Sequence, residues 1–204
     1  MSRITIRSLL LACVVLAGSC AGGGYRHPRL AELGPSVMTV AIVPFHYGAS
    51  GLDSVDARIV TEAVRDGAYA ALADGHNQKR YTTTLQSLAA TDSLLARAGI
   101  EPVAVTRRTH AELGRIMGVD AILRGTITEY ADPGFGMRVA AGLLGGDPAA
   151  AEGRVKCTYT LFDVRTGELL WSLIDDTGAG MLRGGRSALQ KAGGSLADAF
   201  PMRR

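Results

Sequence analysis

The most restrictive feature of this sequence is an apolar, β-branched run from Val37 to Val43 that ends at Pro44. A continuous apolar run of this length is typical of a strand buried on both faces of a sheet, because a half-solvated strand alternates apolar and polar residues. From Leu52 to Leu72 the apolar residues recur at helical spacing, and Gly75 ends the pattern. A buried strand followed by an amphipathic helix is the first half of a βα unit, which predicts a fold of the α/β class.

Strands and helices continue to alternate along the rest of the chain. The patterns predict a mixed sheet of about five strands covered by helices, in a single domain over residues 37–204. Residues 50–53 suggest a capping box for the first helix, Thr109 to Glu112 form one for a later helix, and Gly167 suits a hairpin turn. Further strands are expected over 79–84, 119–130, 155–164 and 168–174, and further helices over 85–98, 109–118 and 187–200.

Residues 131–153 interrupt this alternation and are rich in Gly, Ala and Pro. Their longest apolar stretch, Met137 to Leu144, is far shorter than the roughly 20 residues that cross a bilayer. We expect a mobile loop here. The alternative is a loop that binds a partner or touches a membrane.

Residues 1–19 have the pattern of a bacterial export signal, with two arginines, a short apolar stretch and small residues before Cys20. The segment from Leu16 to Cys20 resembles the lipobox of bacterial lipoproteins. That resemblance implies cleavage before Cys20 and acylation of its thiol, which makes Cys20 the expected membrane anchor. The alternative is a plain secretory signal that happens to end beside a cysteine.

Residues 20–36 are expected to be the lipid-bearing cysteine and a flexible tether, because Gly22 to Gly24 follow it directly. Ala21, in place of Asp, resembles the sorting pattern of outer-membrane lipoproteins and implies a domain held at the outer membrane, facing the periplasm. With Cys20 acylated, Cys157 has no partner for a disulfide. We expect it to be a small buried apolar residue of its strand.

Charge and composition restrict the partners. The basic excess of the whole chain largely disappears once Arg3 and Arg7 leave with the signal, and the remaining excess lies in the tail after residue 180. Nucleic-acid-binding domains show a basic stripe interleaved with aromatic residues, and aromatic residues make up only 5% of this chain. We therefore expect no nucleic acid partner.

The sequence contains few residue patterns that indicate catalysis, metal binding or cofactor binding. Its four histidines are scattered without metal-ligand spacing, and no glycine-rich segment has the ending of a phosphate-binding loop. We predict no metal site, no cofactor and no enzymatic activity. Asp175 and Asp176 form a carboxylate pair in sequence, but a solvated strand end is the favoured interpretation.

The best candidate ligand site is the loop 45–51, since open α/β sheets bind ligands at the carboxyl ends of their strands. His46, Tyr47 and Ser50 would orient a ligand there, and the following helix N-terminus would favour an anion. The alternative is that these side chains only satisfy nearby backbone groups.

Three segments together, Val40–Phe45, Leu113–Tyr130 and Leu161–Trp171, carry a resemblance to a known family. They resemble the bacterial lipoproteins grouped under domain of unknown function 799. They are similar, more distantly, to the curli-secretion lipoprotein CsgG, the penicillin-binding-protein activator LpoB and the amino-terminal domain of TolB.

The resemblance implies a TolB-like or CsgG-like α/β domain that works by contact with other envelope components. The expected function is that of an outer-membrane lipoprotein serving as a non-enzymatic accessory or scaffold in envelope assembly or secretion. Its expected partners are other envelope lipoproteins, a transport complex or a second copy of itself. The alternative is a periplasmic lipoprotein that binds a small molecule or glycan through the loop 45–51.

Overall fold

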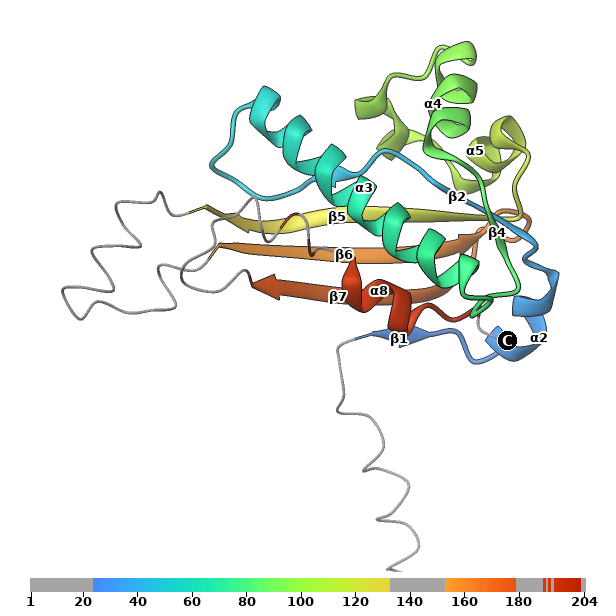
Figure 1. Cartoon of the computed structure of the whole chain (residues 1–204). Helices are drawn as coiled ribbons and strands as arrows, with labels where there is room; N and C mark the ends of the chain where they lie inside the picture. The colour runs from blue at the N-terminus through green and yellow to red at the C-terminus, as the bar shows by residue number, and fades with distance from the viewer. Residues whose placement is uncertain (1–23, 133–152, 179–188, 190, 192, 203–204) are drawn as a thin grey trace, which may run out of the picture.

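A single mixed β-sheet organises the chain, with helices packed on both of its faces (Figure 1). The structure is a computed structural model that describes residues 24–132, 153–178, 189, 191 and 193–202. The predicted signal (1–19), Cys20 and nearly all of the predicted loop 131–153 lie outside the described residues. The predicted α/β class is confirmed.

The described residues form seven strands, where the sequence predicts about five. They are β1 (Tyr25–Arg26), β2 (Thr39–Ile42), β3 (His46–Tyr47), β4 (Thr84–Leu85), β5 (Ala121–Ala131), β6 (Arg154–Asp163) and β7 (Leu169–Gly178). The strand order is β1-β7-β6-β5-β2-β4, and β3 pairs with β5. Strands β2, β3 and β4 are in the parallel part, while β5, β6, β7 and β1 pair antiparallel.

The helices are α2 (Leu30–Leu33), α3 (Ser54–Asn77), α4 (Leu88–Arg97), α5 (His110–Met117) and α8 (Gly194–Ala199), with 3-10 segments η1 (Gly34–Ser36) and η2 (Pro102–Arg107). Asp53, and not Ser50, caps α3, because its carboxylate accepts hydrogen bonds from the amides of Val55 and Asp56, both at 2.9 Å. The capping box of α5 is confirmed, since Thr109 Oγ1 accepts from the amide of Glu112 at 3.2 Å.

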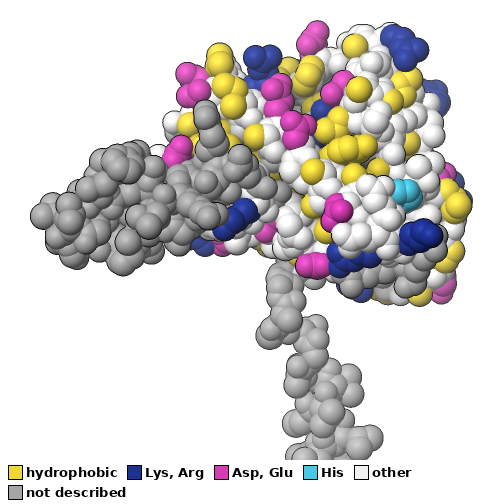
Figure 2. All heavy atoms as spheres, viewed as in Figure 1, with side chains coloured by type: hydrophobic (Ala, Val, Ile, Leu, Met, Phe, Trp, Pro, Cys, Tyr) yellow, Lys and Arg dark blue, Asp and Glu magenta, His cyan; other side chains and the backbone are white. Residues whose placement is uncertain are grey.

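Two apolar cores lie on opposite faces of β2. Ile42 faces a core completed by α3 and α8, whereas Ala41 and Val43 face a second core completed by α4 and α5. Successive strand residues point to opposite faces of the sheet. Because one core covers each face of β2, the residues on both faces are fully buried. This confirms that the run ending at Pro44 is buried on both sides. On the outside of the α3 face, apolar side chains lie scattered among acidic and basic ones (Figure 2).

The amino-terminal segment departs from the prediction of a tether over 20–36. Tyr25 and Arg26 pair with Ser172 and Trp171 of β7, and the amide of His27 donates to the Leu170 carbonyl at 2.8 Å. Helix α2 and η1 follow. The glycines that suggest flexibility are confined to residues 22–24, so the ordered domain begins about twelve residues earlier than composition indicates.

One other predicted element is shorter in the structure, since the strand predicted over 79–84 is reduced to β4 at Thr84–Leu85. The helix predicted over 187–200 is present as α8 over Gly194–Ala199, and residues 189 and 191 are also helical, while residues 187, 188, 190 and 192 lie outside the described residues. Gly193, with φ of 92°, stands immediately before α8. The hairpin between β6 and β7 turns at Gly167, whose φ of 74° matches the prediction.

Candidate functional site: an open face of the sheet

The predicted ligand loop, residues 45–51, contains a short strand. His46 and Tyr47 form β3, which lies beside Thr126 and Ile127 of β5. Pro44 interrupts the strand direction of β2, and Phe45 then packs closely over Gly125, where an added Cβ would lie 2.6 Å from the Phe45 ring. The chain continues along β5, because Ile42 of β2 pairs with Leu123 and His46 of β3 pairs with Thr126.

The three residues predicted to share that loop site are separated by the structure. Tyr47 is half-buried against the α3 core, and burial raises the pKa of its hydroxyl. His46 is exposed on the opposite face, as expected for neighbouring strand residues. Ser50 lies exposed in the bend before α3. The prediction that they orient one ligand together does not fit this arrangement.

His46 instead belongs to a row of side chains that crosses four strands. It stands beside Thr126 of β5, which faces Thr158 of β6, which faces Ile174 of β7. Paired residues project from the same face of a sheet. A second row runs from Arg124 through Thr160 and Ser172 to Tyr25 of β1.

We call the central residues of these rows, Thr126, Thr158, Thr160 and Ser172, the hydroxyl face. All four are half-buried. On this side of the sheet α4 packs mainly on β2 and α5 packs mainly on β5 and, through His110, on Phe162 of β6, so Thr158, Thr160 and Ser172 stay partly exposed. The result is a surface with hydroxyl groups that can both donate and accept hydrogen bonds.

Ion pairs border the hydroxyl face at one end. Arg154 Nε donates to Asp176 Oδ1 at 2.7 Å, and Arg154 Nη1 lies 3.9 Å from Glu129 Oε1. The hydrogen bond from Arg154 lowers the pKa of the Asp176 carboxyl. Lys156 lies between Glu129 and Asp176 in the strand register.

Helix α5 closes the other end of the hydroxyl face. The His110 ring stacks on Phe162 with a centroid distance of 3.7 Å, and Arg124 Nη2 donates to the Arg108 carbonyl at 2.8 Å. Burial lowers the pKa of His110, and the positive charge of Arg124 acts in the same direction.

Asp175 and Asp176 do not form a carboxylate pair, because they point to opposite faces of β7. Asp176 is exposed and bound to Arg154. Asp175 is buried and accepts hydrogen bonds from Thr177 Oγ1 at 2.8 Å and from the amide of Gly193 at 3.0 Å. The favoured interpretation of a solvated strand end is therefore wrong for Asp175, because the segment before α8 covers it.

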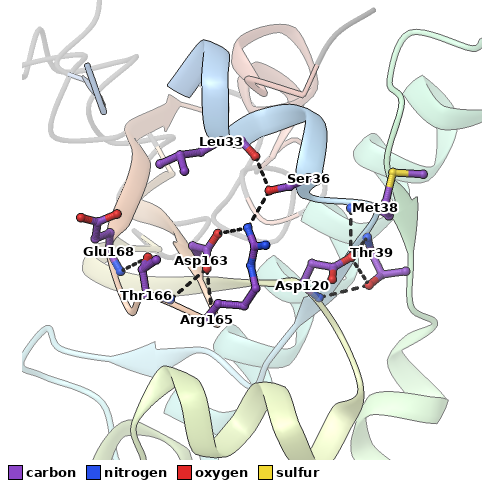
Figure 3. A network of polar contacts seen from close by, with 9 residues as sticks. All are labelled: Leu33, Ser36, Met38, Thr39, Asp120, Asp163, Arg165, Thr166 and Glu168. Atoms are coloured by element: carbon purple, nitrogen blue, oxygen red, sulfur yellow. Dashed lines mark hydrogen bonds and ion pairs between the residues drawn. The ribbon is translucent and has the colours of Figure 1, made fainter. Parts of the chain in front are cut away.

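The motif residues behind the family resemblance hold the opposite end of the sheet together (Figure 3). Asp120 Oδ2 accepts from the amides of Met38 and Thr39, at 3.0 and 2.9 Å, and from Thr39 Oγ1 at 2.9 Å. These bonds fix the entry into β2 beside the start of β5.

A second carboxylate, Asp163, builds the turn after β6 (Figure 3). Its Oδ1 accepts from the amides of Arg165 and Thr166, at 2.7 and 3.1 Å. Arg165 Nη2 then donates to Ser36 Oγ at 2.7 Å, which joins the turn to η1. Both motifs therefore have a structural role.

A surface pocket of about 330 Å³ lies at the carboxyl end of β2. Behind it, the buried Arg65 donates from Nη2 to the Ile42 carbonyl at 2.8 Å and pairs with Asp92, also at 2.8 Å. The lining excludes His46, Tyr47 and Ser50; it consists of Pro44, Asp92, Leu95, Ala96, Gly99, Ile100, Glu101 and Pro102.

The part of the chain that the structure describes contains no group of three or more His, Cys, Asp or Glu side chains placed to hold a metal ion. Within the same residues, no helix has both the length and the apolar character that crossing a membrane requires. Cys157 is buried and free, as predicted, and burial raises the pKa of its thiol to about 12.

Sequence reasoning missed the hydroxyl face, although its signal is present. Residues 124–128 and 156–160 each alternate polar and apolar side chains, which is the period of a strand with one face open. The alternation shows which strands have an open face. It does not show that the open faces of β5, β6 and β7 adjoin, since that depends on strand order.

Comparisons with known proteins support the fold. No protein-family model and no curated protein sequence matches this chain. Among solved structures, the chain is similar to lipoprotein GNA1162 from Neisseria meningitidis, with 18% identity, a TM-score of 0.55, and coverage of 79% of this chain and 96% of that one.

Two other solved structures were matched. A dodecameric PelC variant from Paraburkholderia phytofirmans has 16% identity and a TM-score of 0.53, over 90% of this chain and 99% of that one. The LpoB C-terminal domain from Escherichia coli has 17% identity over 73% of this chain and 92% of that one, and its TM-score of 0.40 is too low to support an argument. The chain thus shares its fold with a bacterial lipoprotein and with PelC.

Proposed function

We propose that this protein is a lipoprotein, anchored to the outer membrane by acyl chains on Cys20, that serves as a non-enzymatic accessory or scaffold in envelope assembly or secretion. The observation that carries the proposal is the hydroxyl face, whose four hydroxyl-bearing side chains stay partly exposed on three neighbouring strands. The lipobox is the reason for proposing a membrane anchor, and the fold that the chain shares with a bacterial lipoprotein supports that anchor.

The hydroxyl face suits contact with another protein. Threonine side chains on a strand have few rotamers, so little side-chain entropy is lost when a partner orders them. Their hydroxyls supply both donors and acceptors, which suits contact with polar groups of a partner. The charged border around Arg154 and Asp176 adds groups that select a partner by charge.

The buried and half-buried polar groups support a structural role in place of a catalytic one. Half-buried Asp120 and buried Asp163 and Asp175 each bind backbone amides, and Arg65 binds the Ile42 carbonyl. These side chains hold turns and strand ends in position. Contact through a surface is then the activity that the described residues favour.

The proposal is tested with a photo-crosslinking residue at Thr158, the centre of the hydroxyl face, and a matched one at Ala70, an exposed position on α3. Irradiated cells should give a discrete adduct with one envelope protein, or with a second copy, from position 158 only. Equal adduct patterns from both positions, or none from position 158, would argue against the hydroxyl face as the contact surface.

The membrane setting has its own test. Cells fed labelled palmitate should label the wild-type protein, and Cys20→Ser should abolish the label and release the protein from the membrane fraction. An unlabelled wild-type protein, or a Cys20→Ser variant that stays membrane-bound, would contradict the anchor.

A second candidate function is binding of a glycan, which is favoured by the position of His46 in line with Thr126 and Thr158. A ligand present at 100 times its dissociation constant should stabilise the protein by about 2.7 kcal/mol. Thermal-shift assays with cell-wall fragments should show a shift that His46→Ala removes and Ser50→Ala retains. No shift in the wild type would exclude this candidate for the fragments tested.

A further inference from the structure

We propose that the sheet edge formed by β1 and β7 faces the lipid surface, with Tyr25 and Ile174 touching the interfacial layer of the bilayer. The inference rests on the acyl anchor at Cys20 in the proposed function. It adds an orientation of the whole domain. Tyr25 and Ile174 lie at the margin of the hydroxyl face, so this orientation leaves Thr126, Thr158 and Thr160, further from the β1 edge, to a protein partner.

The first step is the length of chain between anchor and domain. Tyr25 is held in the sheet, since its amide donates to Ser172 Oγ at 3.2 Å and the amide of His27 donates to the Leu170 carbonyl at 2.8 Å. Tyr25 lies five positions after Cys20. At about 3.4 Å per extended position this stretch reaches about 17 Å, whereas a tether over 20–36 would reach about 58 Å.

A short connection restricts orientation because the sheet is wider than the connection is long. Strands β1 and β4 are at opposite ends of the six-strand order, separated by five intervals. At about 4.8 Å per interval the sheet is about 24 Å wide. Figure 1 shows β1 on the opposite side of the molecule from α4. The β1 edge therefore stays near the bilayer while α4 projects away.

The second step is the chemistry of that edge. Among the described residues, Tyr25 and Ile174 are two of six large apolar side chains that are exposed, at 42% and 44%. Tyr25 pairs with Ser172, so Ile174, two residues further along β7, is its diagonal neighbour on the same face, about 7–8 Å away. Tyrosine suits a membrane interface because its ring is apolar and its hydroxyl stays in water.

The third step explains why this edge is assigned to a lipid surface and not to pairing with a further strand. Beyond Ser172, the outer edge of β7 has no pairing strand among the described residues. Yet Asp175 points from this edge strand into the protein interior, and an inward-pointing charge on an edge strand disfavours addition of a further strand. Lipid contact through Tyr25 and Ile174 requires no such pairing.

The test uses acylated full-length protein, reconstituted into vesicles that contain lipids with a nitroxide quencher on the headgroup. A fluorophore is attached through Arg26→Cys on β1 or through Ala89→Cys on α4, both exposed positions. The native thiol at Cys157 does not compete, because it is 1% exposed. The label at position 26 should lose most of its fluorescence and the label at position 89 should lose almost none.

Two variants sharpen the result. Replacing both Tyr25 and Ile174 by Ser should weaken quenching at position 26, whereas the matched pair Val55→Ser and Ile59→Ser, exposed on α3, should leave it unchanged. Inserting twelve Gly and Ser residues after Ala21 should remove the difference between positions 26 and 89.

The outcomes separate this inference from the function on which it rests. Protein that does not bind the vesicles at all contradicts the acyl anchor. Bound protein with equal quenching at both positions, or with stronger quenching at position 89, overturns the orientation and leaves the anchor intact. Adducts joining two copies through β7 would assign the edge to self-association and also overturn the inference.

Discussion

The carboxylate of Asp175 accepts a hydrogen bond from the backbone amide of Gly193 at 3.0 Å, and this contact joins β7 to the chain entering α8. Gly193 also lies directly against α3, because a Cβ at this position would come within 2.8 Å of Ala68 Cα. The buried carboxylate of Asp175 thus links β7 to the start of α8, and Gly193 carries this link to α3.

Replacing Asp175 by Ala should lower the free energy of unfolding by about 1–3 kcal/mol, because the Gly193 amide would lose its acceptor inside the protein. Asp176→Ala is the matched control. It removes an ion pair with Arg154 that is partly exposed, and such pairs contribute less than about 1 kcal/mol. Urea denaturation measures both values, and equal losses would contradict the structural role assigned to Asp175.

Gly114 on α5 should not tolerate a methyl group. Its Cβ would lie 2.1 Å from Val164 Cγ1, so Gly114→Ala should destabilise the protein by about 1–3 kcal/mol despite the better helix propensity of alanine. Adding Val164→Ala should recover part of the loss. Gly194→Ala, where nothing lies within 4 Å, should be neutral or stabilising in the same thermal unfolding assay.

Asp120→Ala should destabilise the protein by about 1.5–3 kcal/mol, since one carboxylate oxygen accepts three hydrogen bonds from Met38 and Thr39. A double-mutant cycle with Thr39→Val should give a coupling energy of about 0.5 kcal/mol or more. Additive effects in that cycle would show that the hydrogen bond between the Thr39 hydroxyl and the Asp120 carboxylate does not stabilise the protein.

Stability should fall as the pH rises above about 9. Burial raises the pKa of Cys157 from 9.0 to about 12, so between these values the unfolded chain releases a proton that the folded protein retains. The unfolded state is then favoured increasingly with pH. Below pH 9 the thiol is protonated in both states and contributes no slope.

Denaturation curves at pH 7.5 and pH 10 should show a smaller decrease for Cys157→Ala than for wild type, although the variant is less stable at both. Tyr159, whose pKa burial also raises, adds a fall of the same sign only at higher pH. An identical decrease in the two proteins would mean that Cys157 is not the group responsible.

Sequence patterns predicted the elements whose formation depends mainly on residues close together in the sequence. The run before Pro44 identifies β2, the spacing after it identifies α3, and Thr109 with Glu112 locates the start of α5. Gly167 locates the β6–β7 turn, because only a positive φ closes it. In each case a few neighbouring residues contain the whole physical reason.

The remaining features depend on residues distant in sequence. β1 and β3 have two residues each, and neither is stable without the longer strand beside it. The burial of Asp175 depends on Gly193, and the hydroxyl face depends on β5, β6 and β7 lying side by side. His46 was singled out from the sequence as a candidate, but its neighbours Thr126 and Thr158 follow only from register.

The pairing of Tyr25 with Ser172 joins residues 147 positions apart, so the sheet cannot acquire its first strand until its last one exists. A chain that emerges amino-terminus first therefore keeps this leading segment unpaired until β7 has followed it. Pairing at the β1 edge is non-local, so we expect this edge to form late in folding.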